Sequence, residues 1–212
     1  MRVATWNVNS VKAHIEVVTR WLGEAKPDVV CLQEIKCEEQ NFPAAVFEEL
    51  HYSAAVFGQK TYNGVAILSK FPLENIVRGL PGDASDDQSR YIQATVLDGS
   101  RSATVASIYL PNGNPPDTPK YSYKLAWMDR LMAHAKNLLK DEESLVLAGD
   151  YNAIPQALDA KNPSQWIGDA LFLPATRAKF RELEGLGLTD AFRALHPTAA
   201  NQYTFYLSLI HI

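Results

Sequence analysis

The fold is decided at residues 2–34, which read RVATWNVNSVKAHIEVVTRWLGEAKPDVVCLQE. This stretch begins with a short β-rich run, RVATWNV, and ends with a second one, DVVCLQE, which follows Pro27. Between the two runs, four apolar residues recur at helical spacing: Val11, Ile15, Val18 and Leu22. Asn9 or Ser10 is a suitable N-cap for that helix. Strand, helix and strand in this order predict a βαβ unit, and therefore a layered α/β protein.

The rest of the chain continues the alternation of helix and sheet. The predicted elements are a short helix at 42–50, four β runs between 52 and 110, a helix at 118–142, a strand and turn at 144–152 and a helix at 174–195. The four β runs read YSAAVFG, GVAILSK, YIQATVL and ATVASIYL, and no helical pattern separates them. In the last helix, Gly185 and Gly187 are candidate stop signals. Helices around mixed β-sheet predict an α/β sandwich.

Composition sets limits on the class of protein. The chain has 212 residues, 47% of them hydrophobic, and no Gly/Ser-rich or Pro-rich linker, so we expect one compact domain. A formal net charge of −4 argues against non-specific coating of nucleic acid, but it permits a local basic cleft. The two cysteines, Cys31 and Cys37, suggest neither a disulfide framework nor a zinc site, because no histidine pair accompanies them at zinc spacing.

The N-terminus and the apolar runs predict the location of the protein. The first ten residues, MRVATWNVNS, lack the apolar core of a secretory signal. No apolar run approaches the length needed to span a bilayer. We therefore expect a soluble, cytoplasmic protein that has no membrane partner.

Polar residues stand where three of the predicted strands end. Asn7 follows VATW, Glu34 follows VVCLQ, and Asp150 with Asn152 follows LVLAG. Carboxylate and carboxamide oxygens are the ligands that Mg²⁺ prefers, and Mg²⁺ usually takes only one or two protein carboxylates. Glu34 and Asp150 suffice for such a site. A metal there would neutralise phosphate charge and lower the pKa of an attacking water, which favours hydrolysis of phosphoesters.

Each of these polar residues also has a purely structural interpretation. Glu34 is equally suited to capping the segment that follows its strand, and GDYN is a sequence typical of an Asx turn. The recurrence of such groups at the exits of three β segments favours the functional interpretation.

Five motifs, in order, resemble the exonuclease III group of the endonuclease/exonuclease/phosphatase superfamily: WNVNS, LQEIK, YNGVAILSK, SIYLPNG and LAGDYN. The resemblance spans residues 1–206. It implies a four-layer α/β sandwich, with two mixed β-sheets flanked by helices, that acts as a Mg²⁺- or Mn²⁺-dependent DNA phosphodiesterase. It also implies cleavage of duplex DNA at abasic sites, degradation from 3′ ends and removal of 3′ blocking groups, by a protein that we expect to be a monomer.

The resemblance also implies roles for individual residues. Glu34 matches the chief metal ligand, and Asn7 lies beside it in the metal and phosphate network. Asp150 matches the residue that positions and activates the attacking water, and Asn152 matches its phosphate-orienting partner, so that all four belong to the expected metal site. Tyr109 in IYLPNG matches a catalytic tyrosine whose hydroxyl is able to hydrogen-bond a phosphate oxygen. Without the motif, Tyr109 is an ordinary strand aromatic.

Two cations match positions near bound DNA in the family. They are Arg90 in SRYIQA and Lys124 in KYSYKLAW. Both supply the positive charge that a reader of the DNA backbone needs. Taken alone, each is more simply a solvated surface charge.

The resemblance stops at Leu207. Members of the family continue with further strands that carry a late Ser-Asp-His motif, whereas this chain ends with LSLIHI. His211 follows Ile210 rather than Ser-Asp, so it has no matching role. We therefore expect residues 1–206 to form the family domain without its last strands, residues 207–212 to be a non-native tail, and the chain as it stands to be nearly inactive.

Two alternative functions remain open at this point. One is a phosphatase or phosphodiesterase of the same superfamily that acts on lipids, inositol phosphates or nucleotides. The other is a non-catalytic fragment that binds DNA. YNGVAILSK, SIYLPNG and KYSYKLAW favour the DNA-repair branch, and the combination of Glu34, Tyr109, Asp150 and Asn152 favours an enzyme over a binding module.

Overall fold

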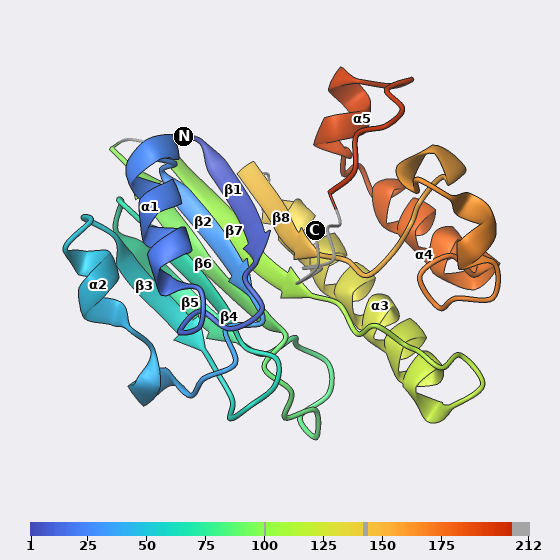
Figure 1. Cartoon of the computed structure of the whole chain (residues 1–212), viewed down its shortest axis with the longest axis horizontal. Helices are drawn as coiled ribbons and strands as arrows, with labels where there is room; N and C mark the ends of the chain where they lie inside the picture. The colour runs from blue at the N-terminus through green and yellow to red at the C-terminus, as the bar shows by residue number, and fades with distance from the viewer. Residues whose placement is uncertain (100, 142–143, 205–212) are drawn as a thin grey trace. The chain divides into compact units, whose positions relative to one another are not determined.

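The structure is a computed structural model that describes residues 1–99, 101–141 and 144–204 (Figure 1). The chain divides into two compact units, which are described separately below. The first unit contains residues 1–111 and 133–151, and the second contains residues 112–132 and the chain from residue 152 onward. The expected boundary between residues 206 and 207 lies outside the described residues.

The first sheet of the larger unit contains the predicted βαβ opening. Its strands are β1 (Val3–Asn7), β2 (Val29–Gln33), β3 (Ser53–Phe57) and β4 (Val65–Ser69), in the order β1-β2-β4-β3. β1 and β2 are parallel, and helix α1 (Ile15–Ala25) connects them. The register pairs Asn7 with Gln33, so Glu34 leaves β2 beside the end of β1.

The second sheet of this unit carries the other two site motifs. Its strands are β5 (Leu73–Arg78), β6 (Tyr91–Asp98), β7 (Arg101–Tyr109) and β8 (Ser144–Asp150), in that order. β7 and β8 are parallel and pair Tyr109 with Asp150. The sequence did not predict β5, an edge strand whose register shifts between Glu74 and Val77 and whose residues are mostly exposed.

Apolar side chains pack the two sheets face to face. The core between them includes Cys31 and Ile67 from the first sheet and Ile92 and Val105 from the second. Helices α1 and α2 (Ala44–Glu48) cover the outer face of the first sheet, where Val18, Leu22 and Phe47 are buried (Figure 1).

The second sheet is also covered by a helix on its outer side. His134, from the part of helix α3 (Pro119–Leu138) that belongs to this unit, packs edge-on against Tyr91 with ring centres 5.5 Å apart. Its Nε2 also lies 2.7 Å from Gln93 Oε1. Helices therefore flank two mixed β-sheets, as the sequence predicted.

The start of α1 differs from the prediction. The helix begins at Ile15 after His14 as N-cap, and neither Asn9 nor Ser10 caps it. Asn9 and Ser10 have φ angles of 43° and 87°, so the chain makes a left-handed turn there before the helix can start. The Ser10 carbonyl accepts a hydrogen bond from His14 N at 3.2 Å, which closes that turn.

The smaller unit is helical. It holds the first part of α3, the helices α4 (Pro174–Glu184) and α5 (Ala191–Leu195), and the short 3₁₀ turns η3 (Ala157–Asp159) and η4 (Pro163–Trp166). The single helix expected at 174–195 is therefore two helices. Gly185 ends α4, as its stop signal suggested, and Asp190 caps α5 by accepting a hydrogen bond from Arg193 N at 3.0 Å.

None of the helices in the described part of the chain combines the length and the apolar character that crossing a bilayer requires.

Candidate active site

Three of the predicted site residues meet at one end of the two sheets. Asn7 ends β1, Glu34 follows β2, and Asp150 ends β8. Asn7 Nδ2 donates one hydrogen bond to Glu34 Oε1 at 2.8 Å and another to Asp150 Oδ2 at 2.9 Å. A single amide group thus joins carboxylates that come from different sheets.

The Asn7 amide presents its nitrogen to the carboxylates because ionised carboxylates only accept hydrogen bonds. Its oxygen accepts a hydrogen bond from Asn9 N at 3.1 Å. In this arrangement Asn7 organises the two carboxylates as a donor, whereas the sequence suggested a metal ligand. A ligand role for Asn7 requires its amide to rotate.

Tyr109 belongs to the same cluster. Its hydroxyl donates to Glu34 Oε1 at 2.9 Å. Burial, followed by the charge of Glu34 and the hydrogen bond to it, raises the pKa of Tyr109 far above its ordinary value. The hydroxyl therefore keeps its proton near neutral pH and acts as a hydrogen-bond donor.

Lys36 is a site residue that the sequence reasoning missed. Its Nζ forms an ion pair with Glu34 Oε2 at 2.9 Å and also donates to Asn9 Oδ1. The available signal was the LQEIK motif itself, which places a cation two residues after the expected metal ligand. Both Glu34 and Lys36 have a φ of 52°, so the backbone between them bends and brings the two side chains together.

Glu34 is consequently held as a carboxylate. Burial acts to raise its pKa, but the hydrogen bonds from Asn7, Lys36 and Tyr109, together with the Lys36 charge, outweigh burial and lower it. The carboxylate is ionised at neutral pH and accepts from three donors in fixed positions.

Packing at Gly64 supports the backbone bend between Glu34 and Lys36. Gly64 has a φ of +88°, and a Cβ at that position would lie 2.5 Å from Ile35 Cγ1. Its carbonyl accepts from Ile35 N at 3.1 Å. The YNGVAILSK motif thus provides a glycine at the position where the Ile35 side chain packs against this loop.

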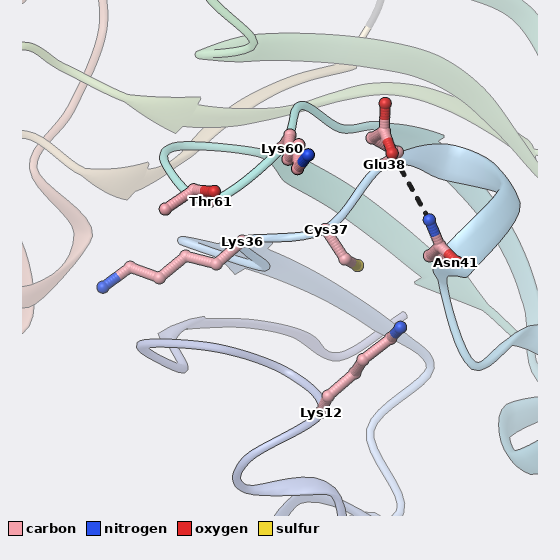
Figure 2. A pocket seen from close by; sticks show the side chains of 7 residues that line it. All are labelled: Lys12, Lys36, Cys37, Glu38, Asn41, Lys60 and Thr61. Atoms are coloured by element: carbon pink, nitrogen blue, oxygen red, sulfur yellow. Dashed lines mark hydrogen bonds between the residues drawn. The ribbon is translucent and has the colours of Figure 1, made fainter.

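A lysine-rich hollow of about 320 Å³ begins beside Lys36 (Figure 2). It is lined by Lys12, Lys36, Cys37, Glu38, Asn41, Lys60 and Thr61. Figure 2 shows that the three lysines come from separate loops. This cluster is a local basic surface, which the net charge of −4 left possible.

Arg90 lies against Tyr109. Its guanidinium is 4.8 Å from the centre of the Tyr109 ring, and Nη1 donates to the Tyr109 carbonyl at 3.4 Å. Its Nε donates to Gln88 Oε1 at 2.7 Å, so the side chain is held on both sides. The positive charge of Arg90 is therefore fixed over the aromatic ring of Tyr109.

The remaining predicted residues, Asn152 and Lys124, belong to the smaller unit. Asn152, with a φ of 42°, accepts a hydrogen bond on Oδ1 from Asn112 Nδ2 at 3.0 Å. Asn112 was not singled out from the sequence, although it stands in the PNG turn that follows Tyr109. Lys124 was expected to contact DNA, but its side chain is buried and Nζ donates to the carbonyls of Asn112 and Asn152.

The donor set of the larger unit suits a hard divalent cation. Glu34 and Asp150 each accept a hydrogen bond from the Asn7 amide nitrogen, so carboxylate oxygens from the two sheets lie near one another. Within the described ranges, no group of three or more His, Cys, Asp and Glu side chains gathers as a metal site. Two carboxylates with neutral oxygen donors fit Mg²⁺ or Mn²⁺ better than zinc.

Comparison with known proteins identifies similar chains. The sequence profile of the Endonuclease/Exonuclease/phosphatase family matches residues 4–207. Exodeoxyribonuclease III of Haemophilus influenzae is 32% identical over 216 residues, which cover 97% of this chain and 80% of the relative.

Two solved structures are also similar. An AP endonuclease from Archaeoglobus fulgidus has 33% identity and a TM-score of 0.92, covering 100% of this chain and 80% of that one. The 3′ phosphatase NExo from Neisseria, solved bound to product DNA hairpin, has 36% identity and a TM-score of 0.89, covering 94% of this chain and 76% of that one.

Proposed function

The chain belongs to the Endonuclease/Exonuclease/phosphatase family and is a hydrolase of phosphodiesters, and we propose that it is a divalent-metal-dependent DNA repair nuclease. The observation that carries the proposal is the pair of carboxylates, Glu34 and Asp150, joined by the Asn7 amide beside the Tyr109 hydroxyl. Acidic oxygens for a cation and a protonated donor then lie within one small cluster.

Glu34 and Asp150 are the residues that would hold the cation. A bound Mg²⁺ or Mn²⁺ neutralises phosphate charge and lowers the pKa of water. Glu34 is suited to this role because it is ionised and its side chain is partly exposed. Asp150, at the end of β8, is the group proposed to orient the attacking water and to accept its proton.

Tyr109 and Asn152 are the proposed donors to the phosphate. The raised pKa of Tyr109 keeps its hydroxyl protonated, which suits hydrogen bonding to a phosphoryl oxygen as charge develops. The Asn152 amide oxygen accepts from Asn112, and Nδ2 is the side-chain atom through which Asn152 would donate to a phosphate oxygen. These are the roles that the motifs implied.

DNA is the substrate that relatives and local charge favour together. The relatives are named as an exodeoxyribonuclease, an AP endonuclease and a 3′ phosphatase bound to DNA. Arg90 and the lysine-rich hollow offer positive charge beside the cluster, which suits a phosphate backbone. We propose cleavage at abasic sites, 3′-to-5′ degradation of duplex DNA and removal of 3′ blocking groups, by a monomer.

Single-turnover cleavage tests the proposal. Purified chain is used in excess over a labelled duplex with one abasic site, or with a 3′-phosphate end, so that slow turnover is measured. The proposed nuclease predicts cleavage in Mg²⁺ or Mn²⁺ and none in EDTA, against the expectation from the motifs that this chain is nearly inactive. Glu34→Gln and Asp150→Asn should each lower the rate by about 10²–10³-fold or more. Glu24→Gln, on the exposed face of α1, is the matched control and should cleave like the wild type.

The other outcomes separate the alternatives. Hydrolysis of an inositol phosphate without cleavage of DNA would establish a phosphatase and refute the nuclease. DNA binding without turnover, unchanged in Asp150→Asn, would establish a non-catalytic binder. Cleavage that Glu34→Gln abolishes would support the nuclease and contradict the expectation that the chain as it stands is nearly inactive.

A further inference from the structure

A buried lysine ammonium lies between two loops of the smaller unit. Lys124, on helix α3, has 0% exposure, and its Nζ donates to the Asn112 carbonyl at 3.0 Å and to the Asn152 carbonyl at 2.5 Å. An ammonium group has three hydrogens and no acceptor, and a charged donor forms stronger hydrogen bonds than a neutral one. Lys124 therefore ties the backbones of two loops that are 40 residues apart in sequence.

The stem of Lys124 is also closely packed. A Cβ placed on Gly113 would lie 2.7 Å from Lys124 Cδ and 3.2 Å from the Ala170 Cβ. Gly113 itself has a φ of +87°, a conformation that favours glycine. The PNG turn thus packs directly against the lysine stem, and a side chain at position 113 would meet that stem.

The two tied loops are the ones that leave the site strands. Asn112 comes three residues after Tyr109 at the end of β7, and Asn152 comes two residues after Asp150 at the end of β8. Besides the shared ammonium, the loops are joined by the hydrogen bond from Asn112 Nδ2 to Asn152 Oδ1 at 3.0 Å. Both the backbones and the side chains of this pair are therefore held in one arrangement.

We propose that Lys124 is a positioning residue, which sets the orientation of the Asn112 and Asn152 side chains and makes no contact with DNA. The proposal rests on the proposed function, in which Asn152 donates to the phosphate. A contact with a DNA phosphate needs an ammonium that the phosphate can reach, whereas this one is enclosed by its own loops. Loss of the ammonium frees the two backbones, and a displacement of about 1 Å at a reacting group is enough to lower a rate by about 10²-fold.

Two substitutions distinguish positioning from DNA contact. Lys124→Met keeps an unbranched apolar stem and removes the charge, and we expect its single-turnover cleavage rate to fall by about 10²-fold. Its Kd for the abasic duplex in EDTA should change less than about twofold, with an unchanged salt dependence. A lost phosphate contact would instead weaken binding and reduce the slope of log K against log salt by about 1.

Lys124→Arg separates the two roles again. A guanidinium binds phosphate at least as well as an ammonium does, so a DNA contact would survive this change. Positioning predicts that cleavage falls, because a longer, planar guanidinium does not reproduce the two hydrogen bonds that the compact ammonium donates from one nitrogen to the Asn112 and Asn152 carbonyls. Should Lys124→Met fail to fold by circular dichroism, Lys124→Arg, which retains the charge, carries the same comparison. Lys120→Met, an exposed position one turn earlier on α3, is the matched control.

A double-mutant cycle tests whether Lys124 acts through Asn152. In an Asn152→Ala background, the rate cost of Lys124→Met should nearly disappear, because the side chain that Lys124 orients is gone. Full additivity of the two costs would overturn the proposal. A reduced salt slope in Lys124→Met, or wild-type cleavage in Lys124→Arg, would overturn it as well.

One readout does not depend on catalysis. The side-chain amide signals of Asn112 and Asn152 in a ¹H–¹⁵N spectrum should shift in Lys124→Met and stay in place in Lys120→Met. Unmoved signals would refute positioning even if the wild type cleaves DNA. Shifted signals in a chain that cleaves no substrate would refute the proposed function and leave the role of Lys124 in orienting these two side chains supported.

Discussion

Replacing Asn7 with leucine tests the hydrogen bonds that join the two site carboxylates. Leucine keeps a similar volume and removes the amide that donates to Glu34 at 2.8 Å and to Asp150 at 2.9 Å. A hydrogen bond to a charged group contributes about 1.5–3 kcal/mol. Both carboxylates are partly exposed, so the lower end applies, and we expect a loss of about 3 kcal/mol for the two bonds. For a chain of this size, that loss lowers Tm by about 6–12 °C.

The loss should also depend on pH. The pKa of Glu34 is lowered in the folded protein. A lowered pKa contributes stability that is present above the unfolded value of about 4.3 and is lost as the pH falls through the folded value. The difference in Tm between the wild type and Asn7→Leu should therefore be complete at neutral pH and should shrink below about pH 4.

Calorimetry in EDTA, from about pH 2 to about pH 7, measures this difference without a bound metal. Asn137→Leu, an exposed position on α3, controls for the replacement of an asparagine by an apolar residue. A Tm that falls by less than about 2 °C, or by the same amount at every pH, would show that the amide does not stabilise ionised carboxylates.

Three further changes test other contacts of the site. Tyr109→Phe removes the donor to Glu34 and should lower the single-turnover cleavage rate by about 10²–10³-fold while DNA binding in EDTA stays within a few fold. Lys36→Met removes a cation that lowers the pKa of Glu34, so the acid limb of the pH–rate profile should move to higher pH; an unmoved limb would contradict this. Gly64→Ala adds a methyl group 2.5 Å from Ile35 Cγ1 at a positive φ, and denaturant unfolding should show a loss of about 1–3 kcal/mol, against less than about 0.5 kcal/mol for Gly23→Ala, where space is open.

Local patterns in the sequence predicted most of the elements correctly. The apolar runs that became β2 and β4 are buried along their whole length, and those that became β6 and β7 are buried over most of it. Runs of this kind are rich in the apolar residues that strands favour, so the sequence predicted them. β5 was missed because LENIVR is an exposed edge strand with a shifted register, and little of it is buried. The cap of α1 was misplaced because Asn9 and Ser10 are good cap residues in general, and only the left-handed turn through them delays the helix.

The sequence by itself predicted most of the strands and helices in order, and it placed Asn7, Glu34 and Asp150 at the ends of strands. The periodicity of apolar residues depends only on residues that are close in the sequence, so it predicts helices and strands without a structure. Only the tertiary structure decided which atoms meet. Asn7 and Asp150 are 143 residues apart and become hydrogen-bonded because two sheets pack face to face. The backbone bend at Glu34 and Lys36 made Lys36 a partner of Glu34, and burial turned Lys124 from an expected surface charge into an internal one.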